Sequence, residues 1–212
     1  MESRTELVAR PRIASRQEWQ QLRDELLVAE KEATRALDAL AARRRRLPMV
    51  PFDNGYVFDT PSGKRTLLEL FDGRNQLVVY QFMDKGPDDY CPGCTNFVNN
   101  IPDVGVRQLA SSGVTWMTVS TMPLTQIEAY KERMGWTIPF VSSRGTSFAE
   151  DCAVGEGFRL SVFLRDREDV FWTYYTTMRG VDRMLWAYSV LDLTPYGRQE
   201  PWEDSPPGWP RA

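Results

Sequence analysis

The amino-acid sequence predicts an α/β fold, with one main domain that follows a long N-terminal helix. The chain has 212 residues, 42% of them apolar and 26% charged, which suits one hydrophobic core. Apolar residues recur every three or four positions over residues 15–40, the period of an amphipathic helix. After residue 51, segments of strand character alternate with segments of helical character. Such alternation is typical of a sheet that contains parallel strands.

The charge balance and the missing histidines exclude several function classes. Lys and Arg number 26 and Asp and Glu 29, for a net charge of −3, so we expect neither nucleic acid nor an anionic membrane as a partner. The chain has no histidine, which excludes Ser-His-Asp and Cys-His catalysis and histidine metal sites. The charged N-terminus does not resemble a secretory signal, and no apolar run approaches the length of about 18 residues that a membrane span needs. We therefore expect a cytoplasmic protein.

The N-terminal helix is predicted from Ser15, with Glu18 at capping-box spacing, to about Leu40. Its apolar stripe should pack on the rest of the chain or on a second copy, and we expect a homodimer. The four arginines of residues 43–46 suit a solvated helix end. The stripe consists of Trp19, Leu22, Leu26, Ala29, Ala33, Leu37 and Leu40.

The remaining elements are expected in the order of a thioredoxin-type core, with parallel units first, then an antiparallel hairpin and a final helix. The apolar run LVVY predicts a strand covered on both faces and central in the sheet. We divide the chain into an N-terminal extension (1–48), a main domain (49–195) and a Pro-rich tail (196–212). The expected segments are YVFD (56–59) and TLLELF (66–71) as the approach to the sheet, the strand QLVVYQF (76–82), a helix from Pro92, a helix at 103–111, a strand at 114–120, a helix at 123–134, a strand at 139–143, a hairpin of 159–166 and 169–177, and a helix at 180–191.

The chemistry centres on the motif Cys91-Pro92-Gly93-Cys94, where a buried strand and a loop lead into a helix. The free N–H groups at the helix start favour a thiolate on Cys91, the expected attacking sulfur. Pro92 suits the first helical turn, and Gly93 keeps side-chain bulk away from a mixed disulfide. Cys94, one turn further on and less exposed, is the expected resolving thiol.

Neighbouring residues leave alternatives open. Lys85 would favour the thiolate, whereas Asp88 and Asp89 would oppose it. Tyr90 either packs or stacks on a substrate. A zinc site would need ligands beyond Cys152, and an inert cysteine pair is the third reading of the motif. Cys152 itself is either a buried core thiol or an auxiliary redox thiol.

The chain resembles the thioredoxin-like domain-of-unknown-function family 899, whose members are described as predicted dithiol-disulfide oxidoreductases. The resemblance runs from about Ile13 to Arg198. It is carried by the blocks LFDGRNQLVVYQFM (70–83), CPGC with its helix (91–101), TVSTMPLTQIEAYKERMGWTIPFVSS (118–143) and RGVDRMLWAYSVLDLTPYGR (179–198). It implies a thioredoxin fold with a peroxiredoxin-like opening segment, FDTPSGKRTLLELFDGR, and dithiol chemistry at Cys91 and Cys94.

The chain departs from related motifs at two places. Thioredoxins carry a proline just before the strand that faces the dithiol, where this chain has Arg159-Leu160-Ser161. Peroxiredoxins carry a threonine three residues before the peroxidatic cysteine, and neither Cys91 nor Cys94 has one there. Arg159 is either an exposed arginine or a binding-site cation near a thiolate.

We therefore expect a dithiol-disulfide oxidoreductase that acts on a disulfide-containing protein or small molecule. An external thiol reductant would restore the dithiol, because the chain has no Gly-rich cofactor-binding loop and no cofactor is expected. One alternative is a thiol peroxidase of peroxiredoxin type. Another is a non-enzymatic binding or scaffold protein that keeps the fold.

Overall fold

The computed structural model describes residues 10–155 and 157–211. The chain falls into two compact units, Pro48–Leu185 on the one hand and the segments up to Leu47 and from Trp186 onward on the other. No helix in the described ranges is long and apolar enough to cross a membrane. The strands are β1 (Val50–Phe52), β2 (Val57–Thr60), β3 (Gly63–Thr66), β4 (Gln76–Gln81), β5 (Val114–Ser120), β6 (Phe140–Ser142), β7 (Arg159–Asp166) and β8 (Asp169–Thr176). The helices are α1 (Arg16–Arg44), α2 (Leu67–Leu70), α3 (Pro92–Asn99), α4 (Asp103–Ser111), α5 (Leu124–Met134), α6 (Phe148–Asp151), the 3₁₀ helix η1 (Met178–Met184) and α7 (Trp186–Leu191).

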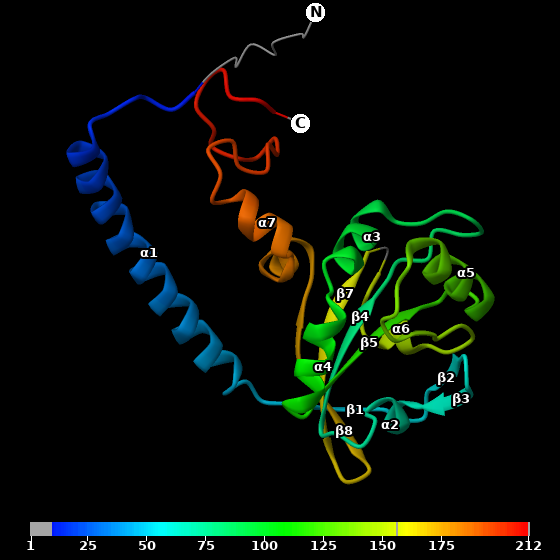
Figure 1. Cartoon of the computed structure of the whole chain (residues 1–212). Helices are drawn as coiled ribbons and strands as arrows, with labels where there is room; N and C mark the ends of the chain where they lie inside the picture. Colours follow the sequence, from blue (N-terminus) through cyan, green and yellow to red (C-terminus); the bar gives the residue numbers. More distant parts are fainter. Residues whose placement is uncertain (1–9, 156, 212) are drawn as a thin grey trace, which may run out of the picture. The chain divides into compact units, whose positions relative to one another are not determined.

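The eight strands found in the described residues form one sheet in the order β1-β8-β7-β4-β5-β6-β2-β3 (Figure 1). The strand β4 pairs with β5 in parallel and with β7 antiparallel, so the apolar run that predicted a central strand has neighbours on both sides. The strand β8 pairs antiparallel with β7, and β6 pairs in parallel with β5. The order β5-β4-β7-β8, with helices between β4 and β5 and after β8, is a thioredoxin-like core. The predicted fold class is confirmed, including the long N-terminal helix.

Side chains of β4 alternate between the two faces of the sheet. Tyr80 stacks on Phe97 of α3, with 4.1 Å between the ring centroids, so α3 covers this face. The opposite face carries Leu77, Val79 and Gln81. Here α2 and α6 cover the main hydrophobic core, whose fully buried members include Phe58, Leu67, Phe71, Phe148 and Phe163.

Three segments differ from their sequence expectations. Residues 67–70 form one helical turn, because Thr66 and Glu69 make a capping box before them. The strand β1, which pairs with β8, was not foreseen. The helix expected at 180–191 is interrupted at Leu185, which is extended (φ −88°, ψ 100°) and separates η1 from α7.

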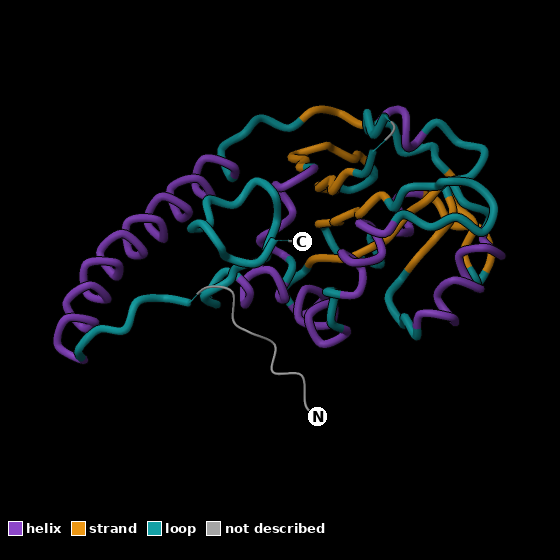
Figure 2. Tube along the Cα trace, turned by 90° about the horizontal axis from the view of Figure 1, so that it is seen from above, coloured by secondary structure: helices purple, strands orange, loops and turns teal. Residues whose placement is uncertain are grey.

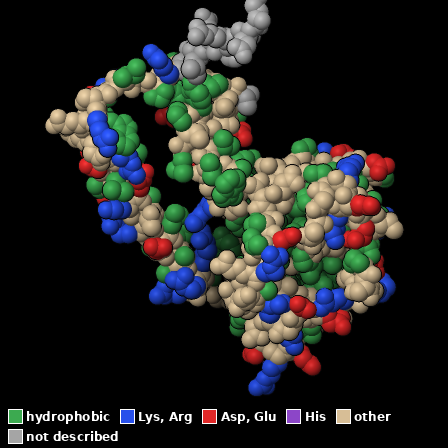
Figure 3. All heavy atoms as spheres, in the orientation of Figure 1, with side chains coloured by type: hydrophobic (Ala, Val, Ile, Leu, Met, Phe, Trp, Pro, Cys, Tyr) green, Lys and Arg blue, Asp and Glu red, His purple; other side chains and the backbone are tan. Residues whose placement is uncertain are grey.

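Helix α1 runs without a break in Figures 1 and 2, and begins as expected after Ser15, whose Oγ accepts from the Glu18 N–H at 3.1 Å. The Glu18 carboxylate pairs with Arg12 instead of closing the capping box. No residue of α1 is buried, and Trp19 and Leu26 of its stripe are 57% and 55% exposed. Green apolar side chains are interspersed with charged ones along its surface in Figure 3.

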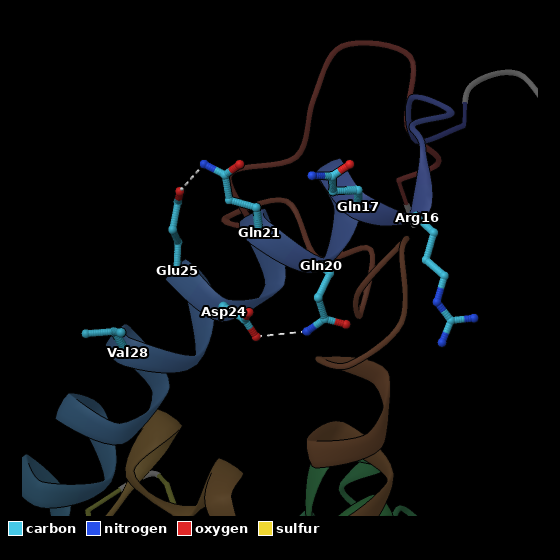
Figure 4. A pocket seen from close by; sticks show the side chains of 7 residues that line it. All are labelled: Arg16, Gln17, Gln20, Gln21, Asp24, Glu25 and Val28. Carbon is cyan, nitrogen blue, oxygen red and sulfur yellow. Dashed lines mark hydrogen bonds between the residues drawn. The ribbon is translucent and has the colours of Figure 1, made fainter.

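A hollow on α1 is lined by seven residues of this helix alone (Figure 4). Four of its polar side chains pair with one another along the helix, with Gln20 donating to Asp24 at 2.8 Å and Gln21 to Glu25 at 3.4 Å. Residues from one helix surface do not enclose a ligand, so the hollow is not a candidate site.

Candidate active site

Cys91 is the N-cap residue of α3, at the place where the chain returns from the loop after β4. Its Sγ accepts a hydrogen bond from the backbone N–H of Cys94, with 3.3 Å between nitrogen and sulfur. The sulfur thus occupies the position that a serine or aspartate oxygen takes in an ordinary helix cap. A negative charge on this sulfur would face the positive end of the helix dipole.

The two residues between the cysteines occupy the positions that the sequence predicts for them. Pro92 is the first residue of α3, where a missing N–H costs no helical hydrogen bond. A Cβ at Gly93 would lie 4.0 Å from Sγ of Cys91. Any larger side chain at Gly93 would extend beside the sulfur at which a mixed disulfide forms, so the glycine keeps this space open.

Cys94 is fully buried one turn into the helix, whereas Cys91 is half-buried, and both are free thiols. Burial raises the pKa of Cys94 to about 12. The backbone of Met83 and the hydroxyl of Tyr80 lie close enough to its sulfur to lower this pKa in part, while Cys91 raises it further. Near neutral pH Cys94 is therefore a protonated thiol, with two nearby polar groups that favour its ionised form.

Tyr80 is a site residue that the sequence did not single out. It is 1% exposed, and burial followed by the nearby Cys94 raises the pKa of its hydroxyl above the ordinary range. Within a run of apolar strand residues, a tyrosine is indistinguishable from a packing aromatic. Only the seating of α3 on β4 brings its hydroxyl to the Cys94 sulfur.

Tyr90 packs against the protein. Its ring stacks on Tyr130 of α5 with 3.6 Å between centroids and an angle of 14°, and the Arg133 guanidinium lies 4.7 Å from both rings. The Tyr130 hydroxyl is 2.6 Å from the hydroxyl of Thr95, which donates to the Cys91 carbonyl at 2.9 Å. This chain of contacts fixes the loop and the start of α3 against α5.

The charged loop before the dithiol is paired within itself. The Lys85 ammonium lies 3.5 Å from the Asp89 carboxylate, and both side chains are largely exposed. Exposed pairs of this kind contribute little energy, and the lysine is engaged with a carboxylate instead of with Cys91.

Arg159 and Cys152 lie on the face of the sheet opposite Cys94. Arg159 pairs in register with Gln81, and its guanidinium lies 4.2 Å from the Tyr175 ring centroid. Cys152 is fully buried, and burial raises its pKa to about 12 although Gln81, Ser161 and the Arg159 charge lower it. The charge of Arg159 therefore acts on Cys152, not on the dithiol.

A pocket of about 250 Å³, here called the β4–β5 pocket, lies at the carboxyl ends of β4 and β5. Gln81 and Glu150 line it from the face of the sheet that α6 covers, and neither Cys91 nor Cys94 is among its lining residues. The polar residues that line it include Gln81, Asp84, Ser120, Ser143 and Glu150. Among the described residues, no group of three or more Cys, Asp or Glu side chains is placed to hold a metal ion.

The fold and the site together define a thioredoxin-fold protein with a C-x-x-C dithiol at the start of the helix that follows the central strand. The chain belongs to a family described as bacterial protein of unknown function (DUF899), which it matches over residues 8–211. A comparison with curated proteins found no match.

Similar solved structures include peroxiredoxins and a thioredoxin-like protein. Peroxidoxin BcpB from Mycobacterium tuberculosis is 18% identical, with 65% of this chain and 95% of that chain covered and a TM-score of 0.44. A mutant of peroxiredoxin Q from Xanthomonas campestris is 19% identical, covering 63% and 90%, with a TM-score of 0.44. An uncharacterized thioredoxin-like protein from Porphyromonas gingivalis is 14% identical, covering 55% and 72%, with a TM-score of 0.41. The fold of this chain is assigned from its strand order. Structural similarities of this extent are not used to assign its chemistry.

Proposed function

We propose that this protein is a cytoplasmic dithiol-disulfide oxidoreductase that reduces a disulfide-containing protein or small molecule. The observation that carries the proposal is the pairing of a half-buried Cys91 sulfur, capped by the Cys94 N–H at 3.3 Å, with a fully buried Cys94 thiol one helical turn further on. An accessible sulfur followed by a shielded one is the arrangement that a two-step exchange requires.

In the first step, the Cys91 thiolate attacks one sulfur of the substrate disulfide. A bond forms between Cys91 and that sulfur, the substrate S–S bond breaks, and the other substrate sulfur leaves as a thiolate. The open space at Gly93 accommodates the mixed disulfide.

In the second step, Cys94 attacks Cys91 and releases the remaining substrate thiolate. Because its pKa is about 12, Cys94 must first lose its proton, and the thiolate that left in the first step can accept it. The Met83 N–H and the Tyr80 hydroxyl then stabilise the charge on Cys94 as it attacks. The dithiol has given two electrons to the substrate, and an external thiol reductant returns them.

The test is equilibration of the purified protein in glutathione buffers of set potential, followed by trapping of free thiols and peptide mapping. We expect one two-electron transition in which Cys91 and Cys94 disappear together while Cys152 stays free. Rapid consumption of peroxide without thiol-disulfide exchange would instead identify a thiol peroxidase. A Cys91→Ser variant that fully retains the cellular function would indicate a binding or scaffold protein.

A further inference from the structure

We propose that two copies of this chain pair through helix α1, and that the two helices run antiparallel with Trp19 of each copy against Arg43 of the other. The inference is independent of the proposed function, because α1 lies outside the compact unit that contains the dithiol. Three features of α1 support it, namely the spacing of the residues along one face, the sizes of those residues and the distribution of charge along the helix.

One face of α1 has the spacing of a two-helix coiled coil. From Trp19 to Arg43 its residues recur alternately three and four positions apart, over a length of about 36 Å at 1.5 Å per residue. Every residue of this face is exposed, and the partly covered residues of α1 lie between them. The face is therefore accessible to a second helix. It is called the seam below and consists of Trp19, Leu22, Leu26, Ala29, Ala33, Ala36, Leu40 and Arg43.

The sizes of the seam residues favour one of the two possible orientations. In a parallel pair each residue meets its own copy, so three successive alanine layers would bury little apolar area and Arg43 would meet Arg43. In an antiparallel pair with Trp19 on Arg43, Leu22 lies on Leu40 and Leu26 lies on Ala36. The two leucines and the tryptophan of the N-terminal half then meet the seam residues of the C-terminal half, and alanine meets alanine only at the centre.

The charge of α1 changes sign along the helix. Residues 16–30 contain four acidic and two basic side chains, whereas residues 31–46 contain six basic and two acidic ones. A parallel pair would bring the arginines of residues 43–46 from both copies together at one end. An antiparallel pair places the basic half of each helix on the acidic half of the other, so the charges attract at both ends.

The layer formed by Trp19 and Arg43 gives a reason for an arginine at the end of an apolar seam. Trp19 is 57% exposed, so its ring is available to a partner, and a guanidinium over an indole ring is an attractive cation–π contact. The neighbouring Glu18 carboxylate is paired with Arg12 at 2.7 Å in an exposed ion pair, which contributes little energy. A second cation from Arg43 of the other copy would add to the charge that this carboxylate faces.

Photo-cross-linking of the full chain tests the orientation. The photoreactive residue p-benzoylphenylalanine replaces Glu18, isotope-labelled and unlabelled copies are mixed and irradiated, and mass spectrometry identifies the attached peptide. We expect attachment between copies, at residues 43–46 of the second copy. A parallel pair would give attachment at residues 19–23, and that result, or attachment within one copy alone, would overturn the inference.

Reversal of charge tests the contact at the end of the seam. Arg43→Glu should raise the dissociation constant of the dimer by about tenfold, because it removes the cation from Trp19 and places a carboxylate beside Glu18 of the second copy. The further change Glu18→Arg should restore the constant to within about threefold of the wild type, since the facing charges are again opposite. The matched control is Arg35→Glu, the same change at an exposed position of α1 outside the seam, which should leave the constant unchanged.

Light scattering after size exclusion over a dilution series gives the dissociation constants. Equal weakening by Arg43→Glu and by Arg35→Glu would overturn the inference, because the effect would then come from the overall charge of the helix. Failure of Glu18→Arg to restore the dimer of Arg43→Glu would overturn the register, and a wild type that stays monomeric would overturn the pairing itself. The cross-link needs neither reversal, so it determines the orientation even where a variant unfolds the helix.

Discussion

The backbone N–H of Cys94 donates a hydrogen bond to Sγ of Cys91 at 3.3 Å, so the resolving residue caps the attacking one. The same helical turn that exposes the first sulfur buries the second, since Cys94 is fully buried against β4. Both consequences follow from the spacing of three residues, which brings the side chain of the first residue over the N–H of the fourth. The roles of the two thiols can therefore be tested separately.

Replacement of Cys94 by serine should trap the substrate on Cys91. The first exchange step needs only the accessible sulfur, whereas release needs the buried thiol, so turnover should fall by about a hundredfold or more. Intact-mass spectrometry after incubation with a disulfide should show the mixed adduct in Cys94→Ser. The same adduct on Cys91→Ser would contradict the assignment of roles.

Replacement of Tyr80 by phenylalanine should slow the resolving step by about three- to tenfold, because it removes a hydroxyl that lowers the pKa of Cys94 and so favours its thiolate. Stopped-flow measurement of adduct formation and decay separates the two steps, and formation should be unchanged. Tyr175→Phe is the control, since this half-exposed tyrosine contacts Arg159 on the other face of the sheet. Equal decay rates in both variants would show that the Tyr80 hydroxyl does not act on Cys94.

Stability should fall as the pH rises above about 9, partly because of Cys152. Its pKa is raised from 9.0 to about 12 by burial, so the folded state keeps a proton that the unfolded state loses. Below the pKa of the unfolded state, Cys152 makes its full contribution to the free energy of unfolding. Between the unfolded and the folded pKa, that contribution falls by about 1.4 kcal/mol per pH unit. Urea denaturation at several pH values should give a shallower decline for Cys152→Ala than for the wild type. If the free energy of unfolding declined equally with pH in Cys152→Ala and in the wild type, the Cys152 thiol would be solvated instead of buried.

The apolar stripe of α1 predicts a homodimer, because no side chain of this helix is buried and Leu22 and Leu26 are 49% and 55% exposed. The double change Leu22→Glu and Leu26→Glu should convert the dimer into a monomer, as measured by light scattering after size exclusion. Gln20→Glu together with Gln21→Glu adds the same charge to polar positions of the helix and should leave the dimer intact. A wild-type mass of one chain at all concentrations would refute the prediction.

Local patterns in the sequence predicted the features of this protein that depend on residues only a few positions apart. The helix beginning at Cys91, the positions of Pro92 and Gly93 and the central strand QLVVYQ follow from capping, backbone conformation and runs of apolar residues. The fold class could also be predicted, because strands and helices with clear periodicity can assemble in few ways. The observed strand order confirms this prediction.

The tertiary structure alone decided which groups surround each thiol. Arg159 and Gln81 lie beside Cys152, and Tyr80 lies beside Cys94, because strand register and the placement of α3 set the face on which each side chain points. The break at Leu185 is equally a tertiary feature, since residues 180–191 keep a helical period along the sequence. Contacts between segments far apart in the chain determine these features, and periodicity within one segment carries no information about them.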